Sequence, residues 1–394
     1  MDLIQNKHRA SELPTHEAEH FSNEKLEKSI HFHSSLPGYK ATPLERLDNL
    51  AKHLNVGAIY VKDESKRFGL NAFKGLGGIF AIASYFARKL DLDLSKTDFQ
   101  KLVDRASSLP KVTFATVTSG NHGRGVAWAA KLFNQHARIY LPKGSSTSRS
   151  DAIKEYGAEA YLSELNYDDT VLRVAKMAAK NDWVLLQDTA WEGYEEIPLD
   201  IMQGYTTIVS EIVDQLGSEP LHNITHVFLQ AGVGSFAAAI AGAIYQLYPK
   251  KSPKIIIVEP RDAGCFYQSA LDDSGKPQRV QGKLDTMMAG LACGEPNPLA
   301  WMILKSISDY FILADDTISA KGMKILGNPL DDDAKIISGE SGAIPIGVVH
   351  EILSHPKNRQ IQNELQLDKT SKILVINTEG DTDPDNYHKI VNHP

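Results

Sequence analysis

Short apolar runs alternate with segments of helical periodicity over most of this chain. Runs of strand length cover residues 58–61, 112–117, 137–141, 160–162, 183–186, 226–229, 255–258 and 373–376, and helical patterns cover 79–90, 125–133, 152–156, 170–179, 201–216 and 237–247. This alternation is typical of parallel sheets flanked by helices. The run 255–258 is apolar throughout, as expected for a strand covered on both faces. The pattern therefore predicts an α/β fold.

The N-terminal region is less regular. Residues 1–35 carry many charges among few apolar positions, which suggests an arm that packs on another part of the protein or on a second subunit. Thr42-Pro43-Leu44-Glu45 has the pattern of a helix start, with Thr42 as N-cap, Pro43 at the first helical position and Glu45 completing a capping box. It predicts a helix that runs to about Leu54.

Composition limits the classes of function. The chain has 394 residues, 42% hydrophobic and 23% charged, which suits a globular protein long enough for two domains. The net charge of -7 is spread along the chain, so we expect no nucleic-acid partner. No apolar run has the length of about 20 residues that spans a membrane, and residues 1–20 lack a signal-peptide core, so we expect a cytoplasmic protein with no membrane partner.

The chain has only two cysteines, Cys265 and Cys293, and neither belongs to a Cys-x-x-Cys pair. We therefore expect no metal site. Two free thiols and a bridge between them both remain open, since the sequence does not give the geometry that a disulfide requires.

In open parallel sheets, ligands bind beyond the carboxyl ends of the strands, so the residues that follow each strand are the candidates for chemistry. After the first of these runs comes Asn71-Ala72-Phe73-Lys74-Gly75-Leu76-Gly77-Gly78. Lys74 lies between apolar neighbours and ahead of glycines that let another backbone or a flat ligand approach. Burial would make its amine nucleophilic, as chemistry with a carbonyl or with pyridoxal phosphate requires.

The run 112–117 is followed by Thr118-Ser119-Gly120-Asn121-His122-Gly123-Arg124-Gly125. Its glycines allow a tight turn into a helix N-terminus, whose free amides can hold an anion such as a substrate carboxylate. Asn121 is placed to hydrogen-bond a ring hydroxyl. His122 taken alone fits a packed or exposed histidine better than a catalytic one.

Two more strand ends carry unusual residues. After 226–229 comes Gln230-Ala231-Gly232-Val233-Gly234-Ser235-Phe236, a glycine-rich turn of the kind that binds phosphate through backbone amides. It has neither the third glycine of a dinucleotide site nor the Gly-Lys-Ser/Thr of a nucleotide-triphosphate loop. After 183–186 comes Gln187-Asp188-Thr189-Ala190-Trp191, where Asp188 beside aromatic residues is either an acid or base with a raised pKa or the cap of a turn.

Taken together, the motifs around Lys74, Ser119-Gly120-Asn121-His122-Gly123 and Gly232-Val233-Gly234-Ser235 resemble the fold-type II pyridoxal-phosphate enzymes. Within that group the chain resembles the diaminopropionate ammonia-lyases from about residue 37 to 387. The stretches that carry this closer resemblance are 69–74, 121–130, 187–194, 290–298, 338–343 and 378–383.

The resemblance implies two domains, each with a mostly parallel sheet flanked by helices. The large pyridoxal-phosphate-binding domain would comprise residues 1–75 and 195–394, the small domain 76–194, and the active site would lie between them. It also implies a homodimer that acts on a small amino acid. Lys74 would carry the cofactor, Asn121 contact its ring hydroxyl, Gly232, Val233, Gly234 and Ser235 bind its phosphate, and Thr378 contact the pyridine nitrogen. Ser119, Gly120, His122 and Asp188 would contact the substrate, with Lys74, Asp188 and Ser119 as the catalytic residues.

One position departs from the family pattern. The ammonia-lyases carry Asp-Gly-Asn-His-Gly where this chain has Ser119-Gly120-Asn121-His122-Gly123. The resemblance implies that the family aspartate takes the Cα proton of the D-substrate and that the acid matching Asp188 serves the L-substrate. We therefore expect an L-selective β-elimination of 2,3-diaminopropionate. The alternatives are a serine or threonine dehydratase or another lyase for β-substituted alanines, since threonine dehydratases and serine racemases carry the serine, and a non-catalytic protein of the same fold.

Overall fold

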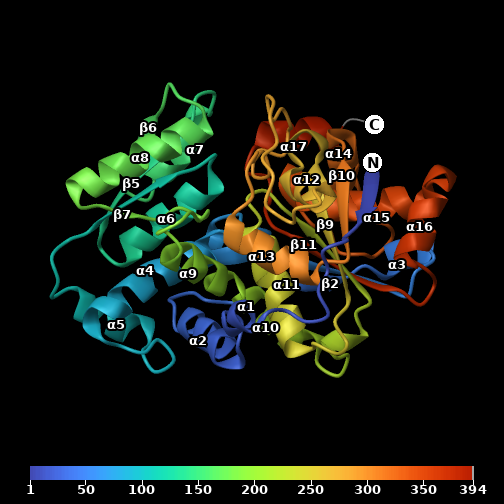
Figure 1. Ribbon diagram of the computed structural model, residues 1–394, viewed down its shortest axis with the longest axis horizontal. Coiled ribbons are helices and arrows are strands. Elements are labelled where there is room, and N and C mark those ends of the chain that lie inside the picture. The colour runs from blue at the N-terminus through green and yellow to red at the C-terminus, as the bar shows by residue number, and fades with distance from the viewer. Residues whose placement is uncertain (393–394) are drawn as a thin grey trace. The chain divides into compact units, whose positions relative to one another are not determined.

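A computed structural model describes residues 1–392, which form two compact units (Figure 1). Unit 1 comprises residues 1–19, 41–72 and 208–394, and unit 2 comprises residues 20–40 and 73–207. The sequence-based division had placed the boundaries at 75/76 and 194/195 and had left 20–40 with the larger domain. The two units are described separately.

Unit 1 contains a seven-stranded sheet in the order β1-β10-β9-β8-β11-β3-β2, as far as the described residues show. Its strands are β1 (Asp2–Gln5), β2 (Leu44–Arg46), β3 (Ala58–Asp63), β8 (His226–Gln230), β9 (Lys254–Pro260), β10 (Tyr310–Ala314) and β11 (Lys372–Asn377). The neighbours from β10 to β3 pair in parallel, and only the edge strands β1 and β2 are antiparallel. The central strands are buried along nearly their whole length, as strands with helices on both faces are.

The helices of unit 1 follow the strands in sequence. They are α1 (Thr15–Glu19), α3 (Asp48–His53), α10 (Thr207–Leu216, from residue 208 on), α11 (Ser235–Leu247), α12 (Cys265–Leu271), α13 (Pro298–Ile307), α14 (Asp316–Gly327), α15 (Glu340–Ser354), α16 (Arg359–Leu365) and α17 (Pro384–Val391). A core cluster joins aliphatic side chains from β3, β9, β10 and β11 to those of α3, α14 and α15.

Unit 2 contains a four-stranded parallel sheet in the order β6-β5-β4-β7, again as far as its described residues go. Its strands are β4 (Thr113–Val117), β5 (His136–Leu141), β6 (Glu159–Leu162) and β7 (Val184–Leu185). Its helices are α2 (Asn23–Ser34), α4 (Gly75–Leu90), α5 (Phe99–Ala106), α6 (Asn121–Leu132), α7 (Thr147–Lys154), α8 (Tyr167–Asn181) and α9 (Glu196–Tyr205). Most of these elements are drawn in cyan to green in Figure 1. Together the two sheets confirm the predicted α/β fold.

The helix predicted from Thr42 to Leu54 is wrong in its first half. Leu44–Arg46 is the edge strand β2, which pairs antiparallel with β3, and the helix α3 begins only at Asp48. The hydroxyl of Thr42 does not cap a helix, because it donates to Glu64 Oε1 at 2.6 Å in the interior of unit 1. The hydroxyl of Thr42 therefore bonds Glu64, a partner that the local capping-box pattern does not indicate.

Other helix boundaries also differ from the predicted ones. The pattern over 201–216 forms two helices, α9 and α10, and α6 starts at Asn121 rather than at residue 125. The N-terminal region expected to be an arm supplies the edge strand β1 to unit 1 and the helix α2 to unit 2.

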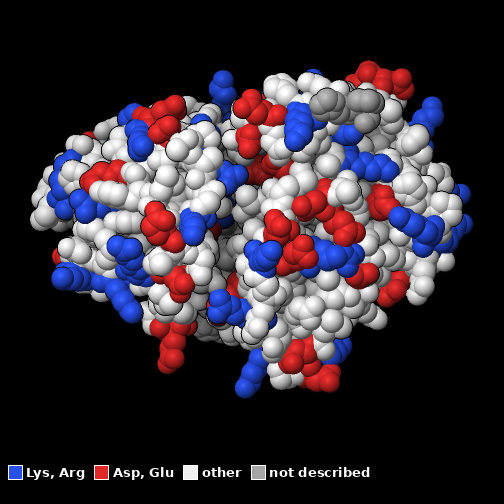
Figure 2. All heavy atoms as spheres, turned by 90° about the horizontal axis from the view of Figure 1, so that it is seen from above, with Lys and Arg blue, Asp and Glu red and all other residues white. Residues whose placement is uncertain are grey.

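On the face drawn in Figure 2, Lys and Arg side chains are interspersed with Asp and Glu. Among residues 1–392, none of the helices has the length and apolar character that a membrane crossing requires.

Candidate active site

Lys74 immediately precedes α4 in unit 2, where α4 approaches α6 very closely. A Cβ built on Gly125 of α6 would lie 3.0 Å from the backbone nitrogen of Gly75 and 3.0 Å from the carbonyl oxygen of Lys74. A side chain at this position would crowd the backbone at the start of α4, so a glycine suits the close approach of the two helices. The contact brings the start of α4, with Lys74, against the helix that carries His122.

The amine of Lys74 is paired with the carboxylate of Asp188. Lys74 Nζ lies 2.6 Å from Asp188 Oδ2, and the two side chains are 19% and 7% exposed. Burial raises the pKa of the Asp188 carboxyl, but the positive charge of Lys74 and the hydrogen bond from Lys74 outweigh it and lower this pKa to about 2. The raised pKa expected from the sequence is therefore wrong for this state, because the neighbouring charge was not visible locally.

His122 is buried on the first turn of α6 and holds one fixed tautomer. Its Nε2 lies 2.7 Å from the carbonyl oxygen of Leu186, which can only accept, so Nε2 carries the hydrogen. Nδ1 therefore bears a lone pair. It lies 3.9 Å from Asp188 Oδ2 and has no hydrogen-bond partner among the described residues. Burial, assisted by the charge of Lys74, lowers the pKa of His122, so the imidazole is neutral.

The turn that leads into α6 is held by a residue that the sequence analysis did not select. Thr118 Oγ1 accepts from the backbone amides of Gly120 at 2.9 Å and Gly123 at 3.1 Å. Ser119, half-buried on this turn, accepts at its carbonyl from Arg149 Nη1 at 3.1 Å, and its hydroxyl has no bond to the other described residues. Asn121 is the first residue of α6. The hydroxyl of Ser119 is thus available to a ligand.

In unit 1, the glycine-rich turn follows β8 and leads directly into α11. Gly234 has φ of +91°, and a Cβ on it would lie 2.1 Å from the ring of Phe266. The position therefore excludes every side chain. Val233 precedes it, and Gly232 approaches the carbonyl oxygen of Gly290 so closely that a Cβ would lie 2.9 Å from it. A backbone turn without side chains at the N-terminus of a 13-residue helix can bind phosphate.

Thr378 follows β11 in the same unit and is bound by Gln230, the last residue of β8. Gln230 Nε2 donates to the carbonyl oxygen of Ile376 at 3.0 Å and to Thr378 Oγ1 at 2.9 Å. Because Thr378 Oγ1 accepts here, its own hydrogen is free to be donated to a ring nitrogen. Gln230 was not selected from the sequence; a buried amide at the end of an apolar strand is the signal that would have identified it.

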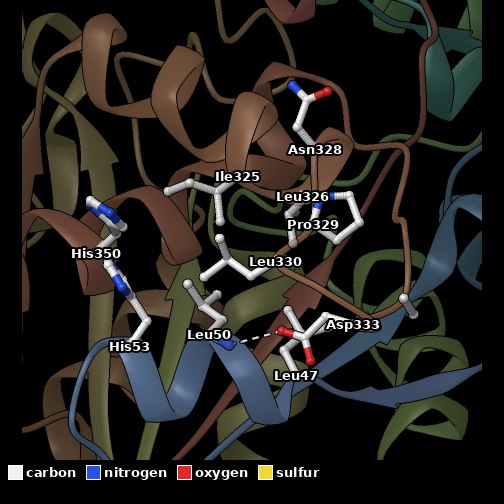
Figure 3. A pocket seen from close by; sticks show the side chains of 11 residues that line it. Leu47, Leu50, His53, Ile325, Leu326, Asn328, Pro329, Leu330, Asp333 and His350 are labelled. Carbon is white, nitrogen blue, oxygen red and sulfur yellow. Dashed lines mark hydrogen bonds between the residues drawn. The ribbon is translucent and has the colours of Figure 1, made fainter.

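A cavity of about 100 Å³ in unit 1 is separate from all of these residues (Figure 3). Its lining is mostly aliphatic, from α3, α14 and the segment after α14, with His53 and His350 beside each other on one side. Asp333 accepts from the amides of Asn49 and Leu50 and so caps α3. None of the predicted site residues lines this cavity.

Cys265 and Cys293 are not joined in a disulfide, and Cys265 is buried. Within residues 1–392, no group of three or more His, Cys, Asp or Glu side chains is arranged to hold a metal ion.

The sequence is similar to those of several known proteins. The family described as pyridoxal-phosphate dependent enzyme matches residues 36–377. The diaminopropionate ammonia-lyase of Salmonella typhimurium is 48% identical over 363 residues, which cover 91% of this chain and 90% of that protein. The diaminopropionate ammonia-lyase of Escherichia coli K12 is 48% identical over 374 residues, covering 94% and 92%.

Solved structures give the same result. The holo diaminopropionate ammonia lyase of Escherichia coli superposes with a TM-score of 0.92 at 46% identity, covering 99% of this chain and 96% of that chain. A second structure of that enzyme, in complex with an aminoacrylate-PLP azomethine reaction intermediate, has a TM-score of 0.90 at 45% identity with the same coverage. A catabolic L-threonine dehydratase of Staphylococcus aureus is 27% identical over 79% of this chain and 78% of its own length.

Proposed function

Because this chain belongs to the fold-type II pyridoxal-phosphate-dependent enzymes and, among them, to the diaminopropionate ammonia-lyases, we propose that it converts 2,3-diaminopropionate to pyruvate and two molecules of ammonia. The observation that carries the proposal is the Lys74–Asp188 pair, a partly buried amine and a buried carboxylate 2.6 Å apart. Such a pair supplies both a group to hold a carbonyl cofactor and a base beside it.

The residues present fit pyridoxal phosphate. Gly232 and Gly234 keep the turn before α11 free of side chains, which suits the phosphate group, and Ser235 adds a hydroxyl at the helix start. Thr378 has a hydrogen to donate to the pyridine nitrogen, because Gln230 already donates to its oxygen. Lys74 would hold the cofactor, and Asn121 would contact its ring hydroxyl. A neutral partner such as Thr378 favours an unprotonated ring nitrogen, which suits β-elimination more than transamination.

When bound, the cofactor withdraws electrons from the substrate Cα and so stabilises the carbanion that proton loss creates. The carboxylate of Asp188 would take the Cα proton of the L-substrate, with the released amine of Lys74 as the other candidate base. Any step that neutralises Lys74 or moves it away removes the charge that lowers the pKa of Asp188, which leaves burial to raise it and to make the carboxylate a stronger base. Gly120 and the start of α6 would hold the substrate carboxylate, with His122 beside it.

The β-amino group would then leave as ammonia after it accepts a proton. The released aminoacrylate would take up water and lose its remaining nitrogen as the second ammonia, which gives pyruvate. We propose that the reaction is L-selective, since Ser119 stands where the family carries an aspartate for the D-substrate and a hydroxyl is a far weaker base than a carboxylate.

The test is pyruvate release from D- and L-2,3-diaminopropionate offered separately, with L-serine and L-threonine alongside. We expect turnover of the L-isomer well above that of the D-isomer. Equal use of both isomers would contradict the selectivity. Turnover of serine or threonine without turnover of either diaminopropionate isomer would move the protein to the dehydratases, the alternative that Ser119 favours. A non-catalytic role is contradicted by turnover of any of the four.

The proposal includes a homodimer, on the strength of the family resemblance. Sedimentation equilibrium of the holoenzyme would measure it, and a mass of one 43.4 kDa chain would contradict it.

A further inference from the structure

Strand β7, which leads to Asp188, ends before it has paired with the whole of its neighbour β4. β7 pairs with β4 only through Val184 and Leu185, and the last backbone contact is the amide of Leu186 donating to the carbonyl oxygen of Ala115 at 2.7 Å. In a parallel ladder that continued, the next groups of β4 to be paired would be the N–H and the C=O of Val117, and their partners would be the backbone of Leu186 and Asp188.

The side chain of Gln187 takes the place of those backbone groups. Its Oε1 accepts from the amide of Val117 at 3.0 Å, and its Nε2 donates to the carbonyl oxygen of Val117 at 3.1 Å. Because Val117 offers one donor and one acceptor, the orientation of the glutamine amide is fixed. The side-chain amide of Gln187 makes two more hydrogen bonds, since Thr116 donates to its Oε1 and its Nε2 donates to the hydroxyl of Tyr167. Gln187 is fully buried.

Because the side chain of Gln187 pairs with Val117 in place of the backbone, the main chain can leave the sheet just before Asp188. The carbonyl of Leu186, no longer needed by β4, accepts from His122 Nε2 at 2.7 Å. The amide of Gln187 donates to the hydroxyl of Tyr194 at 2.8 Å, and that hydroxyl donates to the carbonyl of Leu185 at 2.8 Å. The carbonyl of Leu186 and the amide of Gln187 therefore both have side-chain partners. The chain can turn away here, and the turn is where Asp188 meets Lys74.

We propose that Gln187 is a positioning residue for this reaction, which holds Asp188 against Lys74 and fixes the tautomer of His122 without touching the substrate. The inference rests on the proposed function, in which Asp188 is the base for the L-substrate. A backbone continued in register would carry residue 188 along the sheet. The glutamine amide imitates a peptide group, so that the sheet stays closed while the chain departs from it.

The chain contains a matched control at the other end of the same strand. Gln135 Oε1 accepts from the amide of Val112 at 2.8 Å, and its Nε2 donates to the carbonyl oxygen of Phe133 at 3.0 Å. This glutamine also pairs its amide with the main chain, but it does so before β4 begins, at the end opposite to Asp188. A loss of stability or activity that comes only from a missing pairing between a glutamine amide and the backbone should therefore occur when either glutamine is replaced.

The experiment compares Gln187→Met with Gln135→Met as holoenzymes. Methionine keeps the length of the side chain and removes both polar atoms. We expect both variants to keep the visible absorbance of the bound cofactor and both to lose some thermal stability. For Gln187→Met alone, we expect kcat on L-2,3-diaminopropionate to fall on the order of 10²-fold with little change in KM, the loss that a 1 Å displacement of a reacting group can cause. The Cα-deuterium isotope effect on kcat should rise in the same variant, since proton removal becomes slower.

A second variant keeps the test valid if Gln187→Met does not fold. In Gln187→Glu, a protonated carboxyl can donate to the carbonyl of Val117 and accept from its amide, whereas an ionised carboxylate can only accept. Burial raises the pKa of such a carboxyl. The kcat of this variant, relative to that of the unchanged enzyme at each pH, should therefore rise as the pH is lowered from 8.5 to 6. A ratio that stays constant would overturn the proposal.

The variant Asp188→Asn distinguishes a failure of the proposed base from a failure of the positioning role of Gln187. If it abolishes turnover while Gln187→Met behaves like Gln135→Met, the proposed base stands and the positioning role of Gln187 is overturned. If Asp188→Asn keeps turnover within a few-fold, the base assignment in the proposed function fails, and the role of Gln187 fails with it.

Discussion

Lys74 Nζ and Asp188 Oδ2 lie 2.6 Å apart although 114 positions separate the two residues in the chain. Both belong to unit 2, in which α4 and the turn after β7 meet near the start of α6. The first two predictions below depend on this pair.

Lys74→Ala should abolish turnover and remove the visible absorbance of a covalently held cofactor, since no amine is left to hold it. Absorbance spectra of the purified protein after incubation with pyridoxal phosphate measure this directly. The control is Lys89→Ala, which removes an exposed lysine from the last turn of the same helix and should leave the spectrum unchanged. A normal spectrum in Lys74→Ala would show that another residue holds the cofactor.

Asp188→Asn should lower kcat for the L-substrate by about 10²–10⁴-fold, the usual contribution of a general base. Cofactor binding should persist, because the amide still fits beside Lys74. The measurement is pyruvate release together with titration of the cofactor absorbance. Asp151→Asn, at an exposed ion pair of α7, serves as the control. If turnover survives within a few-fold, Asp188 is a structural acid only.

Ser119→Asp should increase turnover of D-2,3-diaminopropionate, since a carboxylate replaces a hydroxyl as the base on that face. The hydroxyl of Ser119 makes no bond to the described residues, so the exchange breaks no existing contact. The rate of pyruvate release is compared for both isomers, with Ser148→Asp at the exposed start of α7 as the control. An unchanged preference for the L-isomer in Ser119→Asp would mean that the geometry of the turn, and not the base, selects the isomer.

Arg67→Met should destabilise the protein strongly. Arg67 is fully buried and donates to Glu64 and to Glu211, each at 2.7 Å, and Glu211 also accepts from Lys62 at 2.6 Å. Loss of the guanidinium leaves two buried carboxylates with one cation, which costs about 3–5 kcal/mol of unfolding free energy. Denaturant titration measures it, and Arg46→Met, which removes an exposed ion pair, should cost less than about 1 kcal/mol. Equal losses in the two variants would contradict the estimate.

His350→Leu should make stability less sensitive to acid. Burial, together with the charges of Lys321 and His53, lowers the pKa of His350 from 6.5 to about 4. Between these two values the unfolded chain binds a proton at this site that the folded chain does not, so the unfolding free energy falls as the pH drops from 6.5 to 4. Leucine removes this contribution and suits the aliphatic lining of the cavity in Figure 3. Melting temperatures at several values of pH compare the slopes, and identical slopes would contradict the lowered pKa.

The sequence by itself determined the parts of this protein that depend on short-range rules. The alternation of apolar runs and helical patterns predicted the α/β fold, because the period of side-chain burial is a local property. The glycine-rich turns after β4 and β8 were found for the same reason, since Gly234 is required by the backbone of its own turn.

Only the tertiary structure decided what depends on a distant partner. Thr42 has the local pattern of a helix cap, yet its hydroxyl bonds Glu64 and lies near Glu211, 169 positions away, and the chain forms a strand there. For Asp188 the sequence left open the cap of a turn and an acid or base with a raised pKa, and in the structure the charge of Lys74 lowers this pKa. Gln187 looked like an ordinary polar residue, because nothing in the sequence shows that its amide completes the backbone pairing of Val117. In each case the deciding energy is a hydrogen bond or a charge brought close by folding, and such an interaction leaves no periodic signal in the chain.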